Sequence, residues 1–269
     1  MEKNQAIGIF DSGIGGLTVA AAINKILPQE QIIYFGDTAH LPYGDKSAEN
    51  VQYFSQNIAK FLLEKNCKCI IIACNTASSV AYEKVLEITE NKVPVFNVID
   101  PVVAFINLKE TLKKIGVIGT KGTIKSNIYE KKLAQSKPNL EVISLATPLL
   151  APMIEEGFFN NSISKTIIKN YLCYPDLSDI EAIVLACTHY PLIKNDVADF
   201  FENKVDVLDT ASIVAEFVKK NLSEKNLLTE KQKSKDHHFY VSDYTDSFQH
   251  SAKIFFKEKI NLEKANIWI

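Results

Sequence analysis

Short apolar runs alternate with helix-length segments along most of the chain. The runs, rich in Ile and Val, occupy residues 6–10, 31–35, 69–73, 93–98, 115–118, 140–145, 180–186 and 205–208. Segments of helical length separate several of them, among them residues 48–66 and 78–91. Strands joined through helices run parallel, and a near-continuous apolar composition indicates that both faces of such strands are buried. We therefore predict an α/β fold with mostly parallel sheets.

The two halves of the chain resemble each other. Residues 7–12, Ile-Gly-Ile-Phe-Asp-Ser, align with residues 115–120, and residues 70–74, Ile-Ile-Ile-Ala-Cys, align with residues 183–187. Each half thus has a glycine-containing strand that ends in a hydroxyl residue and a later strand that ends in Ala-Cys. Chance similarity between buried strands is the alternative, but the matching order favours a duplication. We expect two similar α/β lobes related by pseudo-twofold symmetry.

The lobe borders carry a weaker signal, because no Pro/Gly/Ser-rich linker marks them. We place residues 1–98 and 209–269 in the first lobe, which carries Cys74, and residues 99–208 in the second, which carries Cys187. In open α/β sheets ligands bind beyond the carboxyl ends of the strands. Both cysteines are expected at such ends, so two facing lobes would each present one thiol.

Charge and hydropathy exclude several classes of protein. The chain has 269 residues and a formal net charge of -2, and no long run of one sign gives it the footprint of a nucleic-acid binder. No stretch approaches the roughly 18 apolar residues of a membrane span, and no apolar signal segment comes before residue 6. We expect a cytoplasmic protein without membrane contact. Lys231, Lys233 and Lys235 are expected in a solvated loop.

The cysteine and arginine counts restrict the kind of site. Five cysteines, an odd number, argue against a disulfide framework, and Cys67 and Cys69 are too close together for a zinc knuckle. We expect no metal. All 30 basic residues are lysine. A small anionic ligand must therefore be held by backbone N–H groups, hydroxyls, amides or lysine rather than by a guanidinium fork.

A glycine-rich segment, Asp-Ser-Gly-Ile-Gly-Gly at residues 11–16, follows the first predicted strand and opens a helical stretch. It fits neither the dinucleotide-binding pattern nor a P-loop. A structural turn that caps the helix is one alternative. We favour binding of substrate by Ser12 and the exposed N–H groups, with Asp11 directed into the site. Residues 42–44, Pro-Tyr-Gly, form a turn sequence whose ligand role depends on the other segments.

The strongest local signals are residues 74–76, Cys-Asn-Thr, and residues 187–189, Cys-Thr-His. A cysteine at the end of a buried strand is usually a small core residue. Here each is followed by hydrogen-bonding residues, and N–H groups at a helix N-terminus stabilise a thiolate. Two cysteines matched in position across a suspected repeat favour catalysis over packing.

Two opposed thiols suit one kind of reaction best. A thiol–disulfide enzyme would place its cysteines close together, typically as CxxC, and these lie far apart in the chain. A papain-like hydrolase needs one nucleophile with a His base, so a second equivalent cysteine has no role there. In a two-base proton transfer one thiolate removes a proton from carbon, and the opposite thiol returns one on the other face.

Taken in order, these segments resemble bacterial glutamate racemases of the aspartate/glutamate racemase superfamily. The similarity also includes residues 119–129, with Thr120, Thr123 and Tyr129, and residues 148–157; it extends from about residue 7 to about residue 255. The resemblance implies an active site between two lobes, no pyridoxal phosphate or metal, a first lobe completed by the C-terminal part, and D-glutamate for peptidoglycan as the product.

The resemblance also implies roles for individual residues. Cys74 would take the α-proton of D-glutamate and Cys187 that of L-glutamate. Asp11 and His189 would assist the thiols, with Glu155 as a further helper. The residues expected to bind substrate are Asp11, Ser12, Pro42, Tyr43, Gly44, Asn75, Thr76, Thr120, Thr188 and His189.

The alternative interpretations concern which substrate the protein uses and whether it is catalytic at all. Aspartate racemases tend to have an acidic residue where this chain has His189, which favours glutamate as the small-molecule partner. The alternatives are a racemase of aspartate or another α-substituted acid, a non-catalytic ligand-binding protein, and a nucleotide-binding protein that uses residues 11–16. Residues 240–243, Tyr-Val-Ser-Asp, depart from the Ser-Gly-Asp common in the family, in a loop expected away from the cysteines. The sequence leaves a homodimer open.

Overall fold

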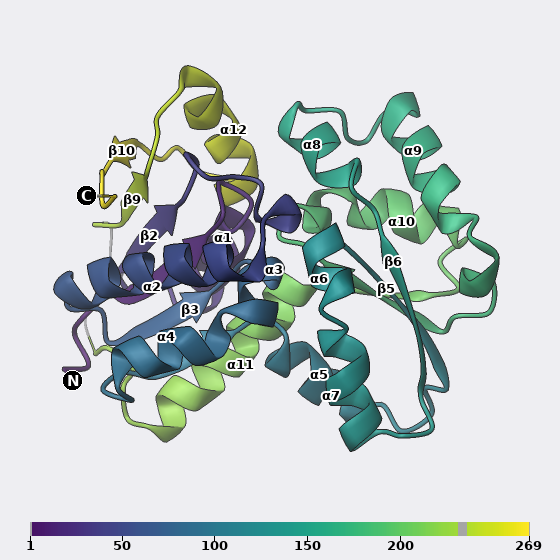
Figure 1. Cartoon of the computed structure of the whole chain (residues 1–269), viewed down its shortest axis with the longest axis horizontal. Helices are drawn as coiled ribbons and strands as arrows, with labels where there is room; N and C mark the ends of the chain where they lie inside the picture. Colours follow the sequence, from purple (N-terminus) through teal and green to yellow (C-terminus); the bar gives the residue numbers. More distant parts are fainter. Residues whose placement is uncertain (1, 231–235, 269) are drawn as a thin grey trace.

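The computed structural model describes residues 2–230 and 236–268, and it contains two sheets that lie side by side (Figure 1). The first sheet has the strand order β10-β9-β2-β1-β3-β4, and the second has the order β6-β5-β7-β8. Lys231, Lys233 and Lys235, predicted in a solvated loop, lie outside the described residues.

All the predicted apolar runs contain strands, with ends shifted by a few residues at most. The strands are β1 (Ile7–Asp11), β2 (Ile32–Gly36), β3 (Cys69–Ile72), β4 (Val95–Asn97), β5 (Lys114–Gly119), β6 (Glu141–Ala146), β7 (Ala182–Ala186), β8 (Asp206–Leu208), β9 (His238–Val241) and β10 (Leu262–Lys264). The strand pairs are parallel. The sequence analysis missed β9 and β10, which are short and have polar residues in their runs.

Helices cover both sheets. They are α1 (Leu17–Ile26), α2 (Ala48–Glu64), α3 (Asn75–Val80), α4 (Tyr82–Thr89), α5 (Asp100–Asn107), α6 (Lys121–Lys125), α7 (Ile128–Ser136), α8 (Leu150–Glu155), α9 (Ser162–Leu172), α10 (Lys194–Phe200), α11 (Thr210–Glu224) and α12 (Asp246–Phe256), with 3-10 turns at η1 (Tyr43–Asp45), η2 (Pro175–Leu177) and η3 (Tyr190–Ile193). The helix predicted over residues 48–66 is confirmed as α2. The helix predicted over residues 78–91 is wrong in form, because α3 starts earlier, directly after its cap Cys74, and a break at Ala81 separates it from α4.

The two sheets repeat one strand order. The series β2-β1-β3-β4 in the first sheet corresponds to β6-β5-β7-β8 in the second. In both, the glycine-containing strand pairs with the strand that leads to a cysteine, in a register that sets Phe10 beside Ile72 and Gly119 beside Ala186. The expected pair of similar α/β lobes is therefore present. Parallel strands in this order bring the ends of β1 and β3, and of β5 and β7, to one edge of each sheet.

The chain returns to the first sheet after β8. Helix α11 packs against α1, β9 pairs with β2, and β10 pairs with β9. In Figure 1 the C-terminal strands, in yellow, lie beside the N-terminal strands, in purple. This pairing supports the lobe borders at residues 98 and 208, which remain our proposal.

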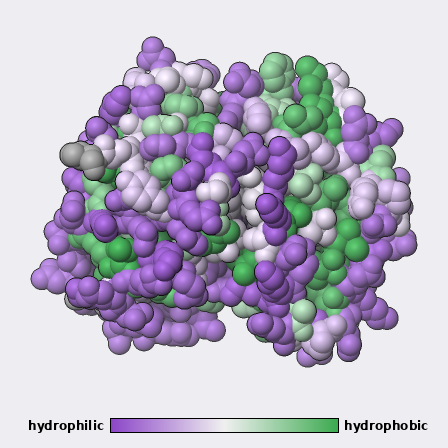
Figure 2. Space-filling view, in the orientation of Figure 1, coloured by the Kyte–Doolittle hydropathy of each residue, from purple (hydrophilic) through white to green (hydrophobic). Residues whose placement is uncertain are grey.

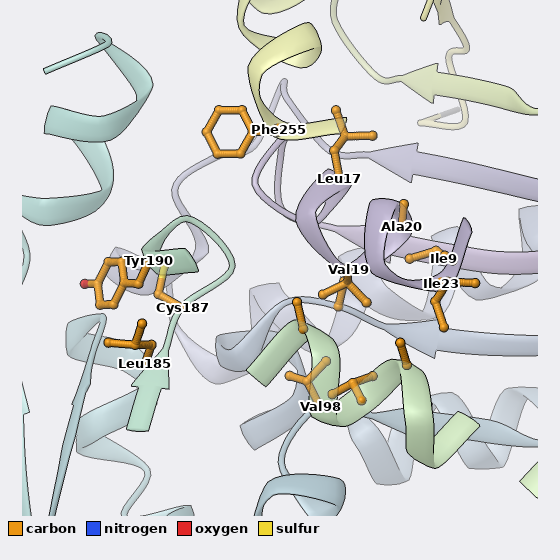
Figure 3. Close-up of a cluster of buried hydrophobic side chains, with 14 of the residues drawn as sticks. Ile9, Leu17, Val19, Ala20, Ile23, Val98, Leu185, Cys187, Tyr190 and Phe255 are labelled. Carbon is orange, nitrogen blue, oxygen red and sulfur yellow. The ribbon is translucent and has the colours of Figure 1, made fainter. Parts of the chain in front are cut away.

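One hydrophobic cluster extends across both lobes. It includes Ile9 and Leu17 of the first lobe and Leu185, Cys187 and Tyr190 of the second. Figure 3 shows these side chains, with those of the second lobe gathered around the end of β7. Burial of apolar area is the main force in folding, so a shared core holds the two sets of strand ends against each other.

The surface is mainly hydrophilic on the face shown in Figure 2, with the more hydrophobic groups over the second lobe. Leu149, Phe158 and Ile163, around α8 and α9, are among the exposed large apolar side chains. Within residues 2–230 and 236–268, no helix combines the length and the hydropathy that a membrane span requires.

A buried ion pair lies in the first lobe. Nζ of Lys68 is 2.5 Å from Oε2 of Glu30, and both side chains are almost fully buried. The same ammonium donates to the carbonyl oxygens of Lys3 and Leu227, each at 2.7 Å. One cation therefore connects the N-terminal segment, the start of β3 and the segment that follows α11.

Candidate active site

A cavity of about 190 Å³ lies where the carboxyl-terminal ends of strands from both lobes meet. Its walls are formed by Ser12, Gly13, Leu41, Pro42, Tyr43, Gly44, Cys74, Asn75, Thr76, Thr120, Ala151, Pro152, Glu155, Ala186, Cys187, Thr188 and His189. The cavity is smaller than the roughly 300–1,000 Å³ of drug-sized sites, which suits a molecule as small as an amino acid. It brings together every predicted site residue except Asp11.

A larger hollow of about 600 Å³ lies elsewhere, between α4, β4 and α11 of the first lobe and α5 of the second. Its lining, which includes Tyr82, Asp100 and Lys225, contains no thiol or imidazole within the described part of the chain. The thiols of Cys74 and Cys187 both lie at the smaller cavity.

The first thiol stands at the N-terminus of α3. Sγ of Cys74 accepts a hydrogen bond from the N–H of Ala77 at 3.4 Å and lies 3.8 Å from Oγ of Ser12. Burial, with the nearby charge of Asp11, raises the pKa of Cys74 to about 12, although the Ala77 and Ser12 contacts act in the opposite direction. Cys74 is therefore a protonated thiol at neutral pH.

The second thiol has a charged neighbour. Sγ of Cys187 lies 3.5 Å from Nδ1 of His189, and Nε2 of the same ring lies 2.8 Å from Oε1 of Glu155. Burial alone would lower the pKa of His189, but Cys187 and then Glu155 raise it well above its usual value. An imidazolium beside a cysteine stabilises the thiolate form. The two thiols therefore have different electrostatic surroundings.

Asp11 is fully buried and is not among the residues that line the cavity, so its direction into the site remains a prediction. Its Oδ2 accepts hydrogen bonds from the N–H groups of Gly16 at 2.9 Å and Gly13 at 3.3 Å. The hydroxyl of Thr188 approaches Oδ1 at 3.5 Å. Burial raises the pKa of Asp11, and the charge of His189 with these N–H groups opposes that rise. The loop turns the carboxylate toward its own backbone because those N–H groups need an acceptor.

Threonine hydroxyls join the lobes at one side of the cavity. Oγ1 of Thr76, from α3, lies 2.8 Å from Oγ1 of Thr120, which caps α6. Oγ1 of Thr123 is 3.2 Å from Thr76 and 3.1 Å from Thr120. On the other side of the cavity, Thr18 donates to the carbonyl oxygen of Thr188 at 2.8 Å. Hydroxyls that donate and accept can re-orient toward a ligand without moving the backbone.

The predicted loop at residues 42–44 is hydrogen-bonded to the buried carboxylate of Asp37. The hydroxyl of Tyr43 donates to Oδ2 of Asp37 at 2.7 Å, and Ser242 donates to Oδ1 at 2.7 Å. Tyr43 therefore presents its ring and backbone rather than its hydroxyl to the cavity. Gly44 has no room for a side chain, because an added Cβ would lie 2.7 Å from Cβ of Thr120. The segment 240–243, expected to be remote, is thus connected to the site through Asp37.

Comparison with known proteins decides the family. The family model for Asp/Glu/Hydantoin racemase matches residues 15–218. The glutamate racemase of Geobacter metallireducens is 41% identical over 244 residues, which cover 91% of this chain and 90% of the relative. The chain belongs to the glutamate racemase family.

Solved structures of glutamate racemases share the whole fold. The crystal structure of glutamate racemase from Francisella tularensis in complex with D-glutamate matches with a TM-score of 0.93 and 39% identity, over 99% of each chain. Glutamate racemase isoform RacE1 from Bacillus anthracis matches with a TM-score of 0.91 and 35% identity, over 98% of each chain. The expected α/β fold with two mostly parallel sheets is therefore confirmed.

Several residues of this glutamate racemase site were missed in the sequence. Gly15 stands against His189, since an added Cβ would lie 2.4 Å from Cε1 of the ring. Asp37 follows the end of β2, a position that could have drawn attention to it. Cavity residues without a predicted role are Gly13, Leu41, Ala151, Pro152 and Ala186. Ala151 and Pro152 lie in the segment 148–157, from which only Glu155 was selected.

Over residues 2–230 and 236–268, the glutamate racemase chain has no group of at least 3 His, Cys, Asp or Glu residues that could hold a metal ion.

Proposed function

We propose that the protein interconverts L- and D-glutamate by two-base proton transfer between Cα of the substrate and the thiols of Cys74 and Cys187. The observation that carries this proposal is that the two thiols, from corresponding strand ends of the two lobes, line one small cavity. A planar carbanion formed at Cα can be reprotonated from either face. Thiols on both sides supply one base and one acid for each direction of the reaction.

The asymmetry of the site supports an order of events for L-glutamate. Cys187, as a thiolate beside protonated His189, takes the α-proton and becomes a thiol. The thiol of Cys74 then gives its proton to the opposite face, which produces D-glutamate and leaves Cys74 as the thiolate. For D-glutamate the roles are reversed. Glu155 keeps His189 protonated, and Asp11 acts from behind the loop that carries Ser12.

Neutral donors would hold the substrate. No lysine is found among the described residues that line the cavity, and the sequence contains no arginine. We propose that Ser12, Asn75, Thr76, Thr120 and Thr188 bind the amino and carboxylate groups together with the N–H groups of the loop at residues 42–44. Each hydrogen bond to a charged carboxylate is stronger than one between neutral groups, so several such donors can replace a guanidinium.

The cellular role follows from the family. We propose that the product is D-glutamate for peptidoglycan synthesis. A cytoplasmic location would keep both thiols reduced, as the proposed chemistry requires. A homodimer also remains a proposal, which sedimentation of the purified protein tests.

The direct test is the optical activity of L-glutamate incubated with the purified protein and no added cofactor. The signal should decay to zero as the racemate forms, and it should decay likewise from D-glutamate. L-aspartate under matched conditions should turn over poorly. Equal turnover of aspartate would assign the chain to another substrate, and a stable signal with every amino acid would favour a non-catalytic ligand-binding protein.

A further inference from the structure

A tyrosine of the second lobe contacts a cavity residue of the first. The hydroxyl of Tyr129, in α7, donates to Oδ1 of Asn75 at 2.9 Å. Asn75 is the first residue of α3, directly after Cys74, and it lines the cavity. Tyr129 does not line the cavity, and its side chain is 1% exposed. The hydrogen bond therefore crosses the lobe boundary behind the site.

This hydrogen bond fixes the direction of the Asn75 amide. A primary amide has one acceptor oxygen and one donor nitrogen on opposite sides. Once Oδ1 accepts from Tyr129, Nδ2 is directed away from the tyrosine. Asn75 is 3% exposed, and its Nδ2 has no hydrogen-bond partner in the part of the chain that the structure describes. Because Asn75 lines the cavity, this donor is available to an acceptor atom of a bound ligand.

The tyrosine is well suited to act as a fixed donor. Its ring packs in a cluster that includes Ile99, Val102 and Leu133. Burial, with the charge of Asp100, raises the pKa of Tyr129 above its usual value, so the hydroxyl keeps its proton at neutral pH. A protonated phenol donates preferentially to the carbonyl oxygen of an amide.

We propose that Tyr129 is a positioning residue that holds the Asn75 amide with Nδ2 toward a carboxylate of the bound amino acid. The inference rests on the proposed function and deepens it, because substrate binding by Asn75 would then depend on contact between the lobes. If the lobes separate, Asn75 loses its orienting partner and its amide is free to turn. Substrate binding and lobe contact are thereby coupled through one hydrogen bond.

Tyr129→Phe tests the proposal because it keeps the ring and removes only the hydroxyl. KM for both enantiomers should rise about tenfold, while kcat changes much less. A tenfold change corresponds to about 1.4 kcal/mol, which is the contribution of one hydrogen bond. Tyr82→Phe is the matched control. It removes the hydroxyl of a tyrosine that donates to the backbone oxygen of Val95, away from the cavity, and it should leave KM unchanged.

A double-variant comparison separates positioning from a general structural role. In the Asn75→Ala background, Tyr129→Phe should have no further effect on KM, because the amide that it orients is gone. Independent, multiplicative effects of the two changes would overturn the inference. Wild-type protein that does not racemise glutamate would instead overturn the proposed function, and calorimetric binding of D-glutamate to the same variants would still test the role of Tyr129.

A structure of the wild-type protein with D-glutamate provides the test that does not depend on a variant. Nδ2 of Asn75 should lie within hydrogen-bond distance of a substrate carboxylate, while Oδ1 still accepts from Tyr129. An amide in the reverse orientation, or one that does not contact the substrate, would contradict the proposal.

Discussion

Oε1 of Glu155 lies 2.8 Å from Nε2 of His189, on the side of the ring opposite to Cys187. The carboxylate from α8 thus stabilises a positive charge next to the second thiol. Cys74 has a different environment, with a backbone N–H and a serine hydroxyl as its polar contacts. The two thiols thus have different surroundings, so the reactions of L- and D-glutamate should start from different protonation states of the site. This difference can be measured.

Glu155→Gln should move the alkaline limb of the pH profile of kcat/KM for L-glutamate to lower pH. Glu155 helps to raise the pKa of His189, so removal of its charge lowers that pKa, and the imidazolium loses its proton earlier as the pH rises. Steady-state rates across pH measure the shift. Glu156→Gln, at the exposed neighbouring position, is the control. An alkaline limb that stays in place in Glu155→Gln would contradict the proposed role.

Alkylation should label Cys187 before Cys74 in the ligand-free protein. Burial raises the pKa of Cys74 to about 12, which keeps this thiol largely protonated near pH 8. Cys187 lies 3.5 Å from the imidazole of His189, and a positive charge next to a thiol increases its reactivity. A Cys173→Ala background removes the exposed cysteine. Mass spectrometry after short treatment with iodoacetamide gives the order. Earlier labelling of Cys74 would show that the thiolate belongs to Cys74 and the thiol to Cys187, which contradicts our assignment.

Replacement of either catalytic cysteine by alanine should abolish inversion in both directions. The remaining thiol still faces one enantiomer and can exchange its α-hydrogen with retention. In heavy water, Cys74→Ala should slowly exchange L-glutamate, and Cys187→Ala should exchange D-glutamate, at rates about 10²–10⁴-fold below wild type. Proton NMR follows the loss of the α-hydrogen. Appreciable racemisation by either variant would exclude the two-thiol mechanism, and the opposite preference would exchange the faces that we assign to the cysteines.

Gly15→Ala should impair catalysis more than folding. The new methyl would lie 2.4 Å from Cε1 of His189 and 2.6 Å from Oγ1 of Thr188, so the ring must move. A displacement of about 1 Å in a catalytic group can lower kcat about 10²-fold. Gly13→Ala, where the nearest atom is 3.4 Å away, should be impaired less. Thermal unfolding of both variants checks the fold, and wild-type kcat in Gly15→Ala would contradict the close packing.

Lys68→Met should destabilise the protein by about 3–5 kcal/mol, because it leaves the carboxylate of Glu30 buried without its cation. Urea denaturation measures the loss. The double variant Lys68→Met with Glu30→Gln should recover much of it, since the uncompensated charge is removed. A double variant as unstable as Lys68→Met alone would show that packing, and not charge, accounts for the effect.

The local sequence pattern was sufficient to predict the central strands and the positions of the two thiols. Each central strand lies in one continuous apolar run, and each thiol stands at the end of such a run. The repeat of Ala-Cys at two strand ends predicted that the thiols meet. Asp37 and Tyr129 were not assigned roles, because their contacts with Tyr43 and Asn75 arise only when distant segments come together. The hydrogen bonds of Asp11 with the N–H groups of its own loop could not be predicted either, because they depend on how the loop folds. Strands β9 and β10, at one side of the first sheet, were missed because half-exposed strands mix polar and apolar residues.

The late pairing of β9 with β2, and of β10 with β9, has a consequence for synthesis on the ribosome. Every strand of the second sheet lies between Lys114 and Leu208, so this lobe can fold as soon as that stretch has emerged. The first sheet stays open at the edge of β2 until residues 238–264 are made. A nascent chain halted after β8 should therefore hold a finished second lobe beside an unfinished first one, which exposes a strand edge to chaperones.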